Sequence, residues 1–347
     1  MLSLDVIAEV FAGEDAWVVG GAVRDDLLGR RPALDVDVAC REPERAARAL
    51  LARAGDAVFP LNEEFGAWRV VLDRSRTVDF SPIRGGSIED DLAGRDFTVN
   101  AIARPVAGGE DVDPFGGRDD AARSVLRTVS ADVFDHDPLR LLRGVRLEDE
   151  LGFRLESETE RLVREHAALV TKPARERILA ELVRLSVDGY RRADELGLLA
   201  PLEGSSAGLD RTALVDRPAF RLVAVFGEAL RRFPVSNETK RYAQKLLDAQ
   251  APADGSPRSI HRFRRVTEPW ALDALVFVGA PELEDEVLAA RADEPTEPLL
   301  RGDELGLPPG PEIGRLLELI AEERAAGTIS TREEALELVR REQASSK

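Results

Sequence analysis

This sequence has almost no cysteine and no long apolar run, and each absence excludes a class of protein. The single cysteine, Cys40, rules out a disulfide within the chain and a metal site built from several thiolates. No stretch approaches the roughly 18 uninterrupted apolar residues of a membrane-spanning helix. The N-terminal segment carries acids where a signal peptide needs basic residues. Together these absences predict a protein of the reducing cytoplasm.

The chain has enough length for two or more domains, with 347 residues of which 44% are hydrophobic. Its net charge of −17 is unevenly distributed. Residues 161–265 hold 20 Lys and Arg against 13 Asp and Glu, whereas residues 266–347 hold 8 against 19. A basic middle between acidic ends is compatible with an RNA-contacting surface. Charge alone nevertheless favours a plainer interpretation, a solvated face on mixed-charge helices.

The first part of the chain alternates short apolar runs with turn signals, which is typical of an α/β unit. The predicted strands are 17–20, 34–40, 67–73 and 77–80, and the predicted helices between them are 22–28 and 44–54. From about Pro138 onward, Leu, Ala, Glu and Arg recur at the helical spacings of three and four. Breaks divide this helical part at 201–208, 251–257 and 308–311. Thr331 with Glu334 predicts a capping box at the start of the last helix.

Two glycines follow the first predicted strand, in the segment VVGGAVRDD. A strand that runs into Gly20-Gly21 and then into a helix lets the backbone approach an anion closely, and the helix start presents free N–H groups. Arg24 and Asp25 add a cation and an acceptor in the first helical turns. By itself, a Gly-Gly after a strand is more often a plain tight turn.

Two aspartates stand two residues apart on the next predicted strand, in LDVDVAC. Residues i and i+2 of a strand point to the same face, so Asp35 and Asp37 share one face while Val36 and Val38 face the core. Two neighbouring carboxylates repel each other, and the arrangement needs a divalent cation or exposure to water. A metal-dependent phosphoryl transferase uses such a pair to hold its ions. The alternative is an edge strand with one wet face, which becomes less favoured beside the Gly-Gly turn and Arg24.

These motifs continue in a fixed order along the chain. They are GRDFTVNAIA (94–103), VDPFGGRDDAARSVLRTV (112–129), HDPLRLLRGVRLEDELGFRLESET (136–159), RERILAELVRL (175–185) and GDELGLPPGPEIGRLLELI (302–320). With the glycine turn and the aspartate pair, this series resembles the class II tRNA nucleotidyltransferase and bacterial poly(A) polymerase family of the polymerase-β nucleotidyltransferase superfamily. The resemblance spans nearly the whole chain and is strongest in residues 18–159.

The resemblance implies an α+β fold, with a small mixed-sheet nucleotidyltransferase head followed by an all-α neck, body and tail. The implied divisions are a head at 1–128, a neck with the base-reading motif at 129–200, and an RNA-binding body and tail at 201–347. Asp35 and Asp37 would ligate magnesium. Asp79 on the 77–80 strand would be a third carboxylate, if a neighbouring strand brings it beside the pair, although a partly exposed strand aspartate is as good a reading.

The resemblance also implies a nucleotide site. Gly20, Gly21, Arg24 and Arg95 would hold the triphosphate, and Asp96 and Asn100 would position the ribose. Asp137 and Arg140 match the residues that read the incoming base, because an acceptor beside donors complements C and A, which each present an exocyclic amine beside a ring nitrogen. Arg140, Arg143 and Arg146 recur every three residues and would form a cationic ridge on one helical face, unless they are only a solvated stripe.

Three positions depart from the family pattern. His136 stands where the family has the glutamate that orients the base-reading arginine, and Gly94 replaces the first of two paired arginines. LEDE (147–150) places acids where apolar packing is expected. His136-Asp137 also suggests the metal dyad of phosphohydrolases, but that site needs a histidine earlier in the chain. The other histidines, His166 and His261, both lie downstream.

The expected function is template-independent addition of C and/or A nucleotides to the tRNA 3′ end, with tRNA, CTP and ATP as partners and Mg²⁺ as cofactor. A CC-adding or A-adding partial enzyme and a poly(A) polymerase are alternatives, and the acidic balance disfavours the last. A catalytically degenerate protein that binds RNA or nucleotide is the alternative of another class. The oligomeric state is left open by the sequence.

Overall fold

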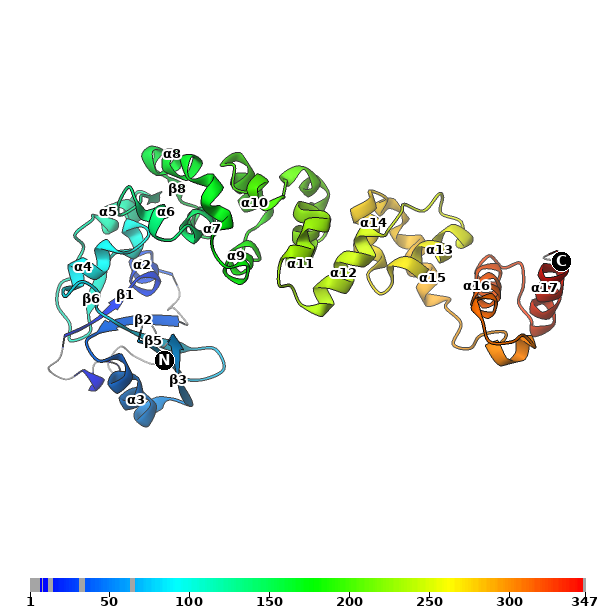
Figure 1. The fold of residues 1–347 in the computed structure, drawn as a ribbon, viewed down its shortest axis with the longest axis horizontal. Coiled ribbons are helices and arrows are strands. Elements are labelled where there is room, and N and C mark those ends of the chain that lie inside the picture. Colours follow the sequence, from blue (N-terminus) through cyan, green and yellow to red (C-terminus); the bar gives the residue numbers. More distant parts are fainter. Residues whose placement is uncertain (1–6, 8, 12–14, 31–34, 63–65, 346–347) are drawn as a thin grey trace. The chain divides into compact units, whose positions relative to one another are not determined.

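The computed structural model describes residues 7, 9–11, 15–30, 35–62 and 66–345, and it forms two compact units, Met1–Leu202 and Glu203–Lys347. Figure 1 shows the elements of both units along the chain. The first unit holds the sheet and the helices that directly follow it, and the second unit is helical. Residue 34 of the predicted strand 34–40 lies outside the described residues. Among the described residues, no helix is long and apolar enough to cross a membrane.

A mixed six-stranded sheet organises the first unit. Its strands are β1 (Ala16–Val19), β2 (Asp35–Cys40), β3 (Ala57–Asn62), β4 (Ala67–Val71), β5 (Thr77–Pro82) and β6 (Ala103–Pro105). They are ordered β3-β4-β5-β2-β1-β6, and only the β2–β5 pair is parallel. All four predicted strands are confirmed, whereas β3 and β6 were missed. Proline disfavours most strand positions, and Pro60 lies inside β3, but β3 is the edge strand beside β4, where proline is tolerated.

Each face of this sheet has its own apolar cluster. On one face, Val38 of β2 and Phe80 of β5 pack with Ala46, Ala47 and Leu50 of α3 (Pro43–Ala54). The other cluster includes Val19 of β1, Ala39 of β2 and residues of α4 (Ile88–Ala93). Strand alternation therefore directs Val36 and Val38 into the apolar cluster under α3, so they face the core as predicted, and it leaves Asp35 and Asp37 on the opposite face.

The remaining elements of the first unit follow the sheet closely. They are α2 (Gly21–Leu27), the 3₁₀ turn η1 (Thr98–Asn100), α5 (Gly117–Ala122), α6 (Val133–His136), α7 (Leu139–Leu151), α8 (Ser157–Glu165), η2 (Ala167–Thr171), α9 (Arg175–Leu182), α10 (Val187–Glu195) and η3 (Ala200–Leu202). A short parallel pair, β7 (Val125–Leu126) with β8 (Arg154–Leu155), interrupts the helices. Close packing fixes α7 at Gly144, where an added Cβ would lie 3.0 Å from Cζ of Phe97.

The second unit contains helices separated at the predicted breaks. They are η4 (Ser206–Leu214), α11 (Pro218–Phe226), η5 (Gly227–Arg232), α12 (Asn237–Leu247), α13 (Pro257–Thr267), α14 (Ala271–Val278), η6 (Pro281–Leu283), α15 (Glu284–Ala292), η7 (Gly302–Leu305), α16 (Pro311–Ala325) and α17 (Arg332–Ser345). The predicted capping box at α17 is confirmed, because the Glu334 N–H donates to Oγ1 of Thr331 and the Thr331 N–H donates to Oε2 of Glu334. The expectation of a mixed-sheet head followed by helices is confirmed as a whole.

Candidate active site

The carboxylates predicted on β2 lie beside a third one on β5. Parallel pairing sets Asp37 directly opposite Asp79, and Asp35 directly opposite Thr77. The Thr77 hydroxyl donates to Oδ1 of Asp35 at 2.6 Å. The strand order thus satisfies the condition on which the prediction for Asp79 depended, namely that a neighbouring strand brings it beside the pair.

The Gly20-Gly21 turn lies against this acidic face. Antiparallel pairing of β1 with β2 sets Val19 opposite Asp37, so Gly20 follows at once. Gly20 has φ of 73°, a left-handed conformation that strains other residues. A Cβ added there would lie 3.1 Å from Nη1 of Arg95 and 3.5 Å from Oδ2 of Asp37. The turn therefore needs glycine both for its backbone conformation and for the close approach of two predicted site residues.

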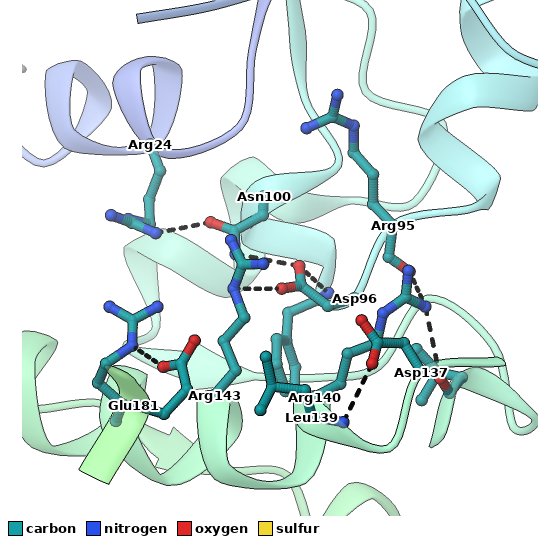
Figure 2. A network of polar contacts seen from close by, with 12 residues as sticks. Arg24, Arg95, Asp96, Asn100, Asp137, Leu139, Arg140, Arg143 and Glu181 are labelled. Carbon is teal, nitrogen blue, oxygen red and sulfur yellow. Dashed lines mark hydrogen bonds and ion pairs between the residues drawn. The ribbon is translucent and has the colours of Figure 1, made fainter. Parts of the chain in front are cut away.

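Arg24 begins a chain of polar contacts that joins α2, η1 and α7 (Figure 2). Nη1 of Arg24 donates to Oδ1 of Asn100 at 2.6 Å, and Nδ2 of Asn100 donates to Oδ1 of Asp96 at 3.1 Å. Nε of Arg143 lies 2.9 Å from the other oxygen of Asp96. Four predicted nucleotide-binding residues therefore meet in one network, of which Arg24, Asp96 and Asn100 are buried.

The Asp96 carboxylate is buried yet charged. Burial works to raise its pKa, but the charge of Arg143 and hydrogen bonds from Asn100 and the Phe97 N–H outweigh it, so the pKa is lowered. Oδ2 of Asp96 has no well-aligned hydrogen bond among the described residues, although the Arg143 ion pair is close. This oxygen is itself buried and faces the Arg143 guanidinium, so its negative charge is balanced within the network.

Arg95 lies between the acidic face and α4. Its guanidinium pairs with Asp91 at 3.1 Å, and Asp91 is buried. Although part of Asp37 meets solvent, burial of its carboxyl group raises the pKa, with Arg95 opposing the rise and Asp79 adding to it. Arg95 is thus a cation beside the point where Gly20 approaches the acids.

The two predicted base-reading residues are both held in place. Oδ1 of Asp137 accepts from the Leu139 N–H at 3.2 Å, and Oδ2 accepts from Nη2 of Arg177 in α9 at 2.7 Å. Nη2 of Arg140 donates to the backbone carbonyl of Gly94 at 2.6 Å. Asp137 and Arg140 therefore share the start of α7, where the resemblance predicted them to act together.

Two of the departures from the family pattern concern Arg140. The exposed His136 ring is bound to Asp132 at 3.1 Å, one turn back along the chain. Arg140 instead donates to main-chain carbonyls, those of Gly94 at 2.6 Å and of Arg95 and Val133 at 3.4 Å. The backbone around Gly94 thus orients Arg140 in this chain, where the family uses a glutamate side chain at position 136.

The predicted arginine ridge on α7 divides between two surroundings. Arg143 faces Asp96, as described above. Arg146 is buried, and it pairs with Glu181 of α9 at 2.5 Å and with Glu150 at 2.7 Å. The structure brings Arg143 to the predicted nucleotide residues and holds Arg146 between α7 and α9, so a nucleotide contact by Arg146 stays a prediction.

The acids of the LEDE segment all have structural partners. Glu148 pairs with Arg192 of α10 at 2.9 Å and also accepts from the Leu155 N–H. Asp149 accepts from the N–H of Ser186, the residue that caps α10. Glu150 pairs with Arg146 and with Arg184. The acids therefore connect neighbouring segments to α7, which gives this departure a structural role.

The donor set fits a divalent cation held by two carboxylates. Oxygen atoms of Asp35 and Asp37 are the ligands that magnesium prefers, and a cation relieves the repulsion among the acids. Both oxygens of Asp79, however, accept from Arg69 of β4, at 2.7 Å each. In the part of the chain that is described, no group of three or more His, Cys, Asp or Glu side chains is arranged to hold a metal ion.

Sequence reasoning missed Arg69 and Arg177. Arg69 precedes the buried Val70 on β4, so strand alternation directs it to the face that carries Asp79. The face of β4 that carries Arg69 could be predicted from the sequence, but the register in which β4 pairs with β5 could not. Arg177 stands in the motif 175–185, and its partner Asp137 is 40 residues away. Such a contact has no local signal.

Known proteins resemble the chain in both sequence and structure. A family model described as Poly A polymerase head domain matches residues 16–87 and 73–127. The CC-adding tRNA nucleotidyltransferase of Thermus thermophilus is 33% identical, over 94% of this chain and 93% of its own length. The A-adding tRNA nucleotidyltransferase of Deinococcus radiodurans is also 33% identical, over 94% of this chain and 95% of its own length.

A solved structure is also similar to this chain over nearly its whole length. The Bacillus stearothermophilus CCA-adding enzyme in complex with CTP matches with a TM-score of 0.74 and 25% identity, over 99% of this chain and 98% of that chain. The similarity thus covers the helical part as well as the head, as the ordered motifs indicated. The chain belongs to the tRNA nucleotidyltransferase family.

Proposed function

We propose that this chain adds C and/or A nucleotides to the 3′ end of tRNA without a nucleic-acid template, using CTP or ATP. The convergence of the Asp35–Asp37 pair, the Gly20 turn and the network from Arg24 to Arg143 carries the proposal. Family membership supports it, since the relatives above are CC-adding and A-adding tRNA nucleotidyltransferases. The proposed partners are therefore tRNA and the two nucleotides.

In the proposed reaction, the 3′-hydroxyl oxygen of the RNA forms a bond to the α-phosphorus of the nucleotide. The bond from that phosphorus to the bridging oxygen breaks, pyrophosphate leaves, and the hydroxyl proton passes to solvent. The chemistry that Mg²⁺ supplies, when held by Asp35 and Asp37, is charge stabilisation at the α-phosphate and at the attacking hydroxyl.

The other residues act by binding and orientation. Arg95, beside the Gly20 turn, attracts the phosphates, and Gly20 lets them approach the backbone. Asp96 and Asn100 position the ribose, as the family resemblance implies, and Arg24 holds Asn100 in place. Fixed groups of this kind lower the barrier by positioning the reactants before the reaction begins.

Base selection falls to Asp137 and Arg140. A carboxylate acceptor beside guanidinium donors complements C and A, whose edges each present an amine donor and a ring-nitrogen acceptor. U and G lack this pattern, because each sets a carbonyl acceptor beside a ring N–H donor, so their polar groups would face like groups of Asp137 and Arg140, which gives discrimination. Arg177 supports this role by holding Oδ2 of Asp137 at 2.7 Å.

The remaining assignments follow from the family. We propose a nucleotidyltransferase head at 1–128, a neck with the base-reading residues at 129–200, and an RNA-binding body and tail at 201–347, in a cytoplasmic enzyme. A partial CC-adding or A-adding activity is the closest alternative, because both kinds occur among the relatives. A degenerate binding protein is less favoured, since the LEDE acids have structural partners and Arg140 is held despite His136.

A primer-extension experiment tests the proposal. Transcripts of tRNA that end before CCA, after C and after CC are offered to the chain with each nucleotide and Mg²⁺, and the products are sequenced. We expect incorporation of C, of A or of both, and none of U or G. Absence of incorporation in every combination would refute the proposal, and the first transcript that is not extended identifies a partial enzyme.

A further inference from the structure

Arg69 lies on the acidic face of the sheet, and the proposed function gives it no role. Antiparallel pairing of β4 with β5 sets it directly opposite Asp79, and parallel pairing of β5 with β2 sets Asp79 opposite Asp37. Side chains at opposed register positions point to the same face of a sheet. Arg69, Asp79 and Asp37 therefore form a row across three neighbouring strands.

The contact between Arg69 and Asp79 uses every oxygen of the carboxylate. Nε donates to Oδ1 and Nη2 donates to Oδ2, both at 2.7 Å. This fork-to-fork geometry is the strongest that an arginine and a carboxylate can form. The side chains are 34% and 19% exposed, so water screens the pair only in part. Among the described residues no such fork holds Asp35 or Asp37, and Asp35 accepts from the Thr77 hydroxyl instead.

The charge of Arg69 acts on all three acids. A guanidinium within a row of carboxylates offsets their mutual repulsion, which lets the acidic face form without a bound cation. The same charge repels a divalent cation that enters the site, because the two positive charges lie within the reach of Coulomb interaction on a partly buried surface. Arg69 thus both withholds Asp79 from the cation and opposes the cation directly.

We propose that Arg69 sets the divalent-cation affinity of the site by holding Asp79 in a bidentate ion pair, so that Asp35 and Asp37 alone serve as ligands. The inference rests on the proposed function for the location of the cation site. It assigns Arg69 as a positioning residue that keeps cation binding weak and leaves Asp79 as a ligand in reserve. A chain without Arg69 would offer three carboxylates.

The test is Mn²⁺ binding to the full chain without RNA or nucleotide, measured from the spectrum of free Mn²⁺ by electron paramagnetic resonance. Arg69→Met removes the charge and keeps the apolar stem of the side chain. We expect it to bind Mn²⁺ about tenfold or more tightly than the parent, because one repulsive charge is lost and one carboxylate is gained. Arg69→Lys keeps the charge without the fork and should lie between the two.

Three further variants test whether a change in Mn²⁺ binding comes from the release of Asp79 and whether the ion binds at Asp35 and Asp37. Arg76→Met is the matched control, since Arg76 also pairs with an aspartate, Asp73 at 2.6 Å, on the same hairpin. Arg69→Met with Asp79→Asn should lose the gain in affinity, because the released carboxylate is gone. Asp35→Asn with Asp37→Asn should abolish binding in either background.

Unchanged or weaker Mn²⁺ binding by Arg69→Met would overturn the inference, and so would a gain that survives Asp79→Asn. Either result in a chain that still extends tRNA leaves the proposed function standing. Binding that persists without Asp35 and Asp37 would instead refute the cation site of the proposed function. Arg69→Met could also fail to fold without metal. In that case, stabilisation of its fold by added Mn²⁺, measured by thermal unfolding, supports the inference. No stabilisation by Mn²⁺, together with an Mn²⁺ affinity of Arg69→Lys equal to that of the parent, contradicts it.

Discussion

Arginine–carboxylate pairs dominate the polar contacts of both compact units, but their surroundings differ. In the first unit, the network from Arg24 through Asn100 and Asp96 to Arg143 links three elements that are far apart in the sequence. Its central carboxylate, Asp96, is 5% exposed. Removal of one member from such a network leaves another charge or polar group buried without a partner.

In the second unit, the arginines of α13 meet the glutamates of α16 near the surface. The pairs are Arg258 with Glu323 at 2.6 Å, Arg262 with Glu322 at 2.6 Å, and Arg265 with Glu318 at 2.6 Å. The side chains of Arg262 and Arg265 are 66% and 62% exposed, whereas those of Glu322 and Glu323 are 13% and 17% exposed. Because water and salt reach the arginine of each pair, we expect each pair to contribute about 1 kcal/mol or less.

The difference shows how little a count of charges says about function. The basic stretch 161–265 includes α13, but glutamates from the acidic end of the chain neutralise its arginines. The interpretation that charge alone favoured, a solvated face on mixed-charge helices, therefore fits α13. In the first unit, the charges of the network at Asp96 lie where burial makes the loss of a partner costly.

The largest effect is expected at the acidic face. Asp35→Ala with Asp37→Ala should lower the rate of nucleotide addition by about a thousandfold or more, since a cation stabilises several kcal/mol of developing charge. The first unit should keep or gain thermal stability, because carboxylate repulsion is lost. Initial rates of tRNA extension and a thermal melt check both parts. A variant as active as the parent would contradict the site assignment.

The next effect breaks the buried network. Asp96→Ala should destabilise the first unit by about 3 kcal/mol, because Arg143 and Asn100 lose their common partner. Urea unfolding measures the change. Arg143→Met with Asp96→Ala should cost less than the sum of the single variants, and strict additivity would show that the two side chains do not interact.

The same carboxylate predicts a pH dependence. Since the folded pKa of Asp96 is lowered, its contribution to stability is complete above the ordinary carboxyl pKa of about 4 and is lost as pH falls through the lower folded value. The parent should therefore lose stability more steeply than Asp96→Asn below about pH 4. Urea unfolding from pH 7 to pH 3 tests this, and parallel curves for the two chains would contradict it.

An intermediate effect is expected where LEDE fastens α10. Asp149→Ala removes the acceptor for the N–H of Ser186 at 2.7 Å and for its hydroxyl at 2.5 Å. The loss should cost about 0.5–1.5 kcal/mol, the usual net contribution of a hydrogen bond, because water reaches Ser186 and can partly replace the acceptor. Asp188→Ala on the same helix is the control, because its side chain is 87% exposed. Equal costs for both would show that the Asp149 contact does not matter.

The smallest effect is expected in the second unit. Gln at positions 318, 322 and 323 in place of Glu should cost at most about 1 kcal/mol for each pair. The cost should shrink as salt rises, since salt already screens the parent's pairs. Unfolding followed by fluorescence of Trp270, the only tryptophan after residue 202, measures it. Glu312→Gln on α16 is the control, and a loss as large as that of Asp96→Ala would remove the contrast between the units.

Local patterns accounted for much of the fold. The alternation of LDVDVAC placed Asp35 and Asp37 on one face and Val38 on the other, and helical spacing predicted the long helical part. The role of Gly20 could be predicted from the sequence, because the turn between the strand and the helix needs a backbone conformation that glycine adopts most easily. Strand β3 was missed, because Pro60 is tolerated only on an edge, and edge position is a property of the whole sheet.

The sequence by itself determined which residues could carry the chemistry, because strand and helix periods act over a few residues and motifs preserve their spacing. Only the tertiary structure decided their partners. Strand pairing set Asp79 beside Asp37 and let Arg69 form an ion pair with Asp79. Helix packing paired Arg146 with Glu181 instead of with the network at Asp96. The reason is that the register between strands and the packing between helices depend on contacts among residues far apart in the sequence. Burial then determines how strongly each charged group affects the free energy of folding and binding.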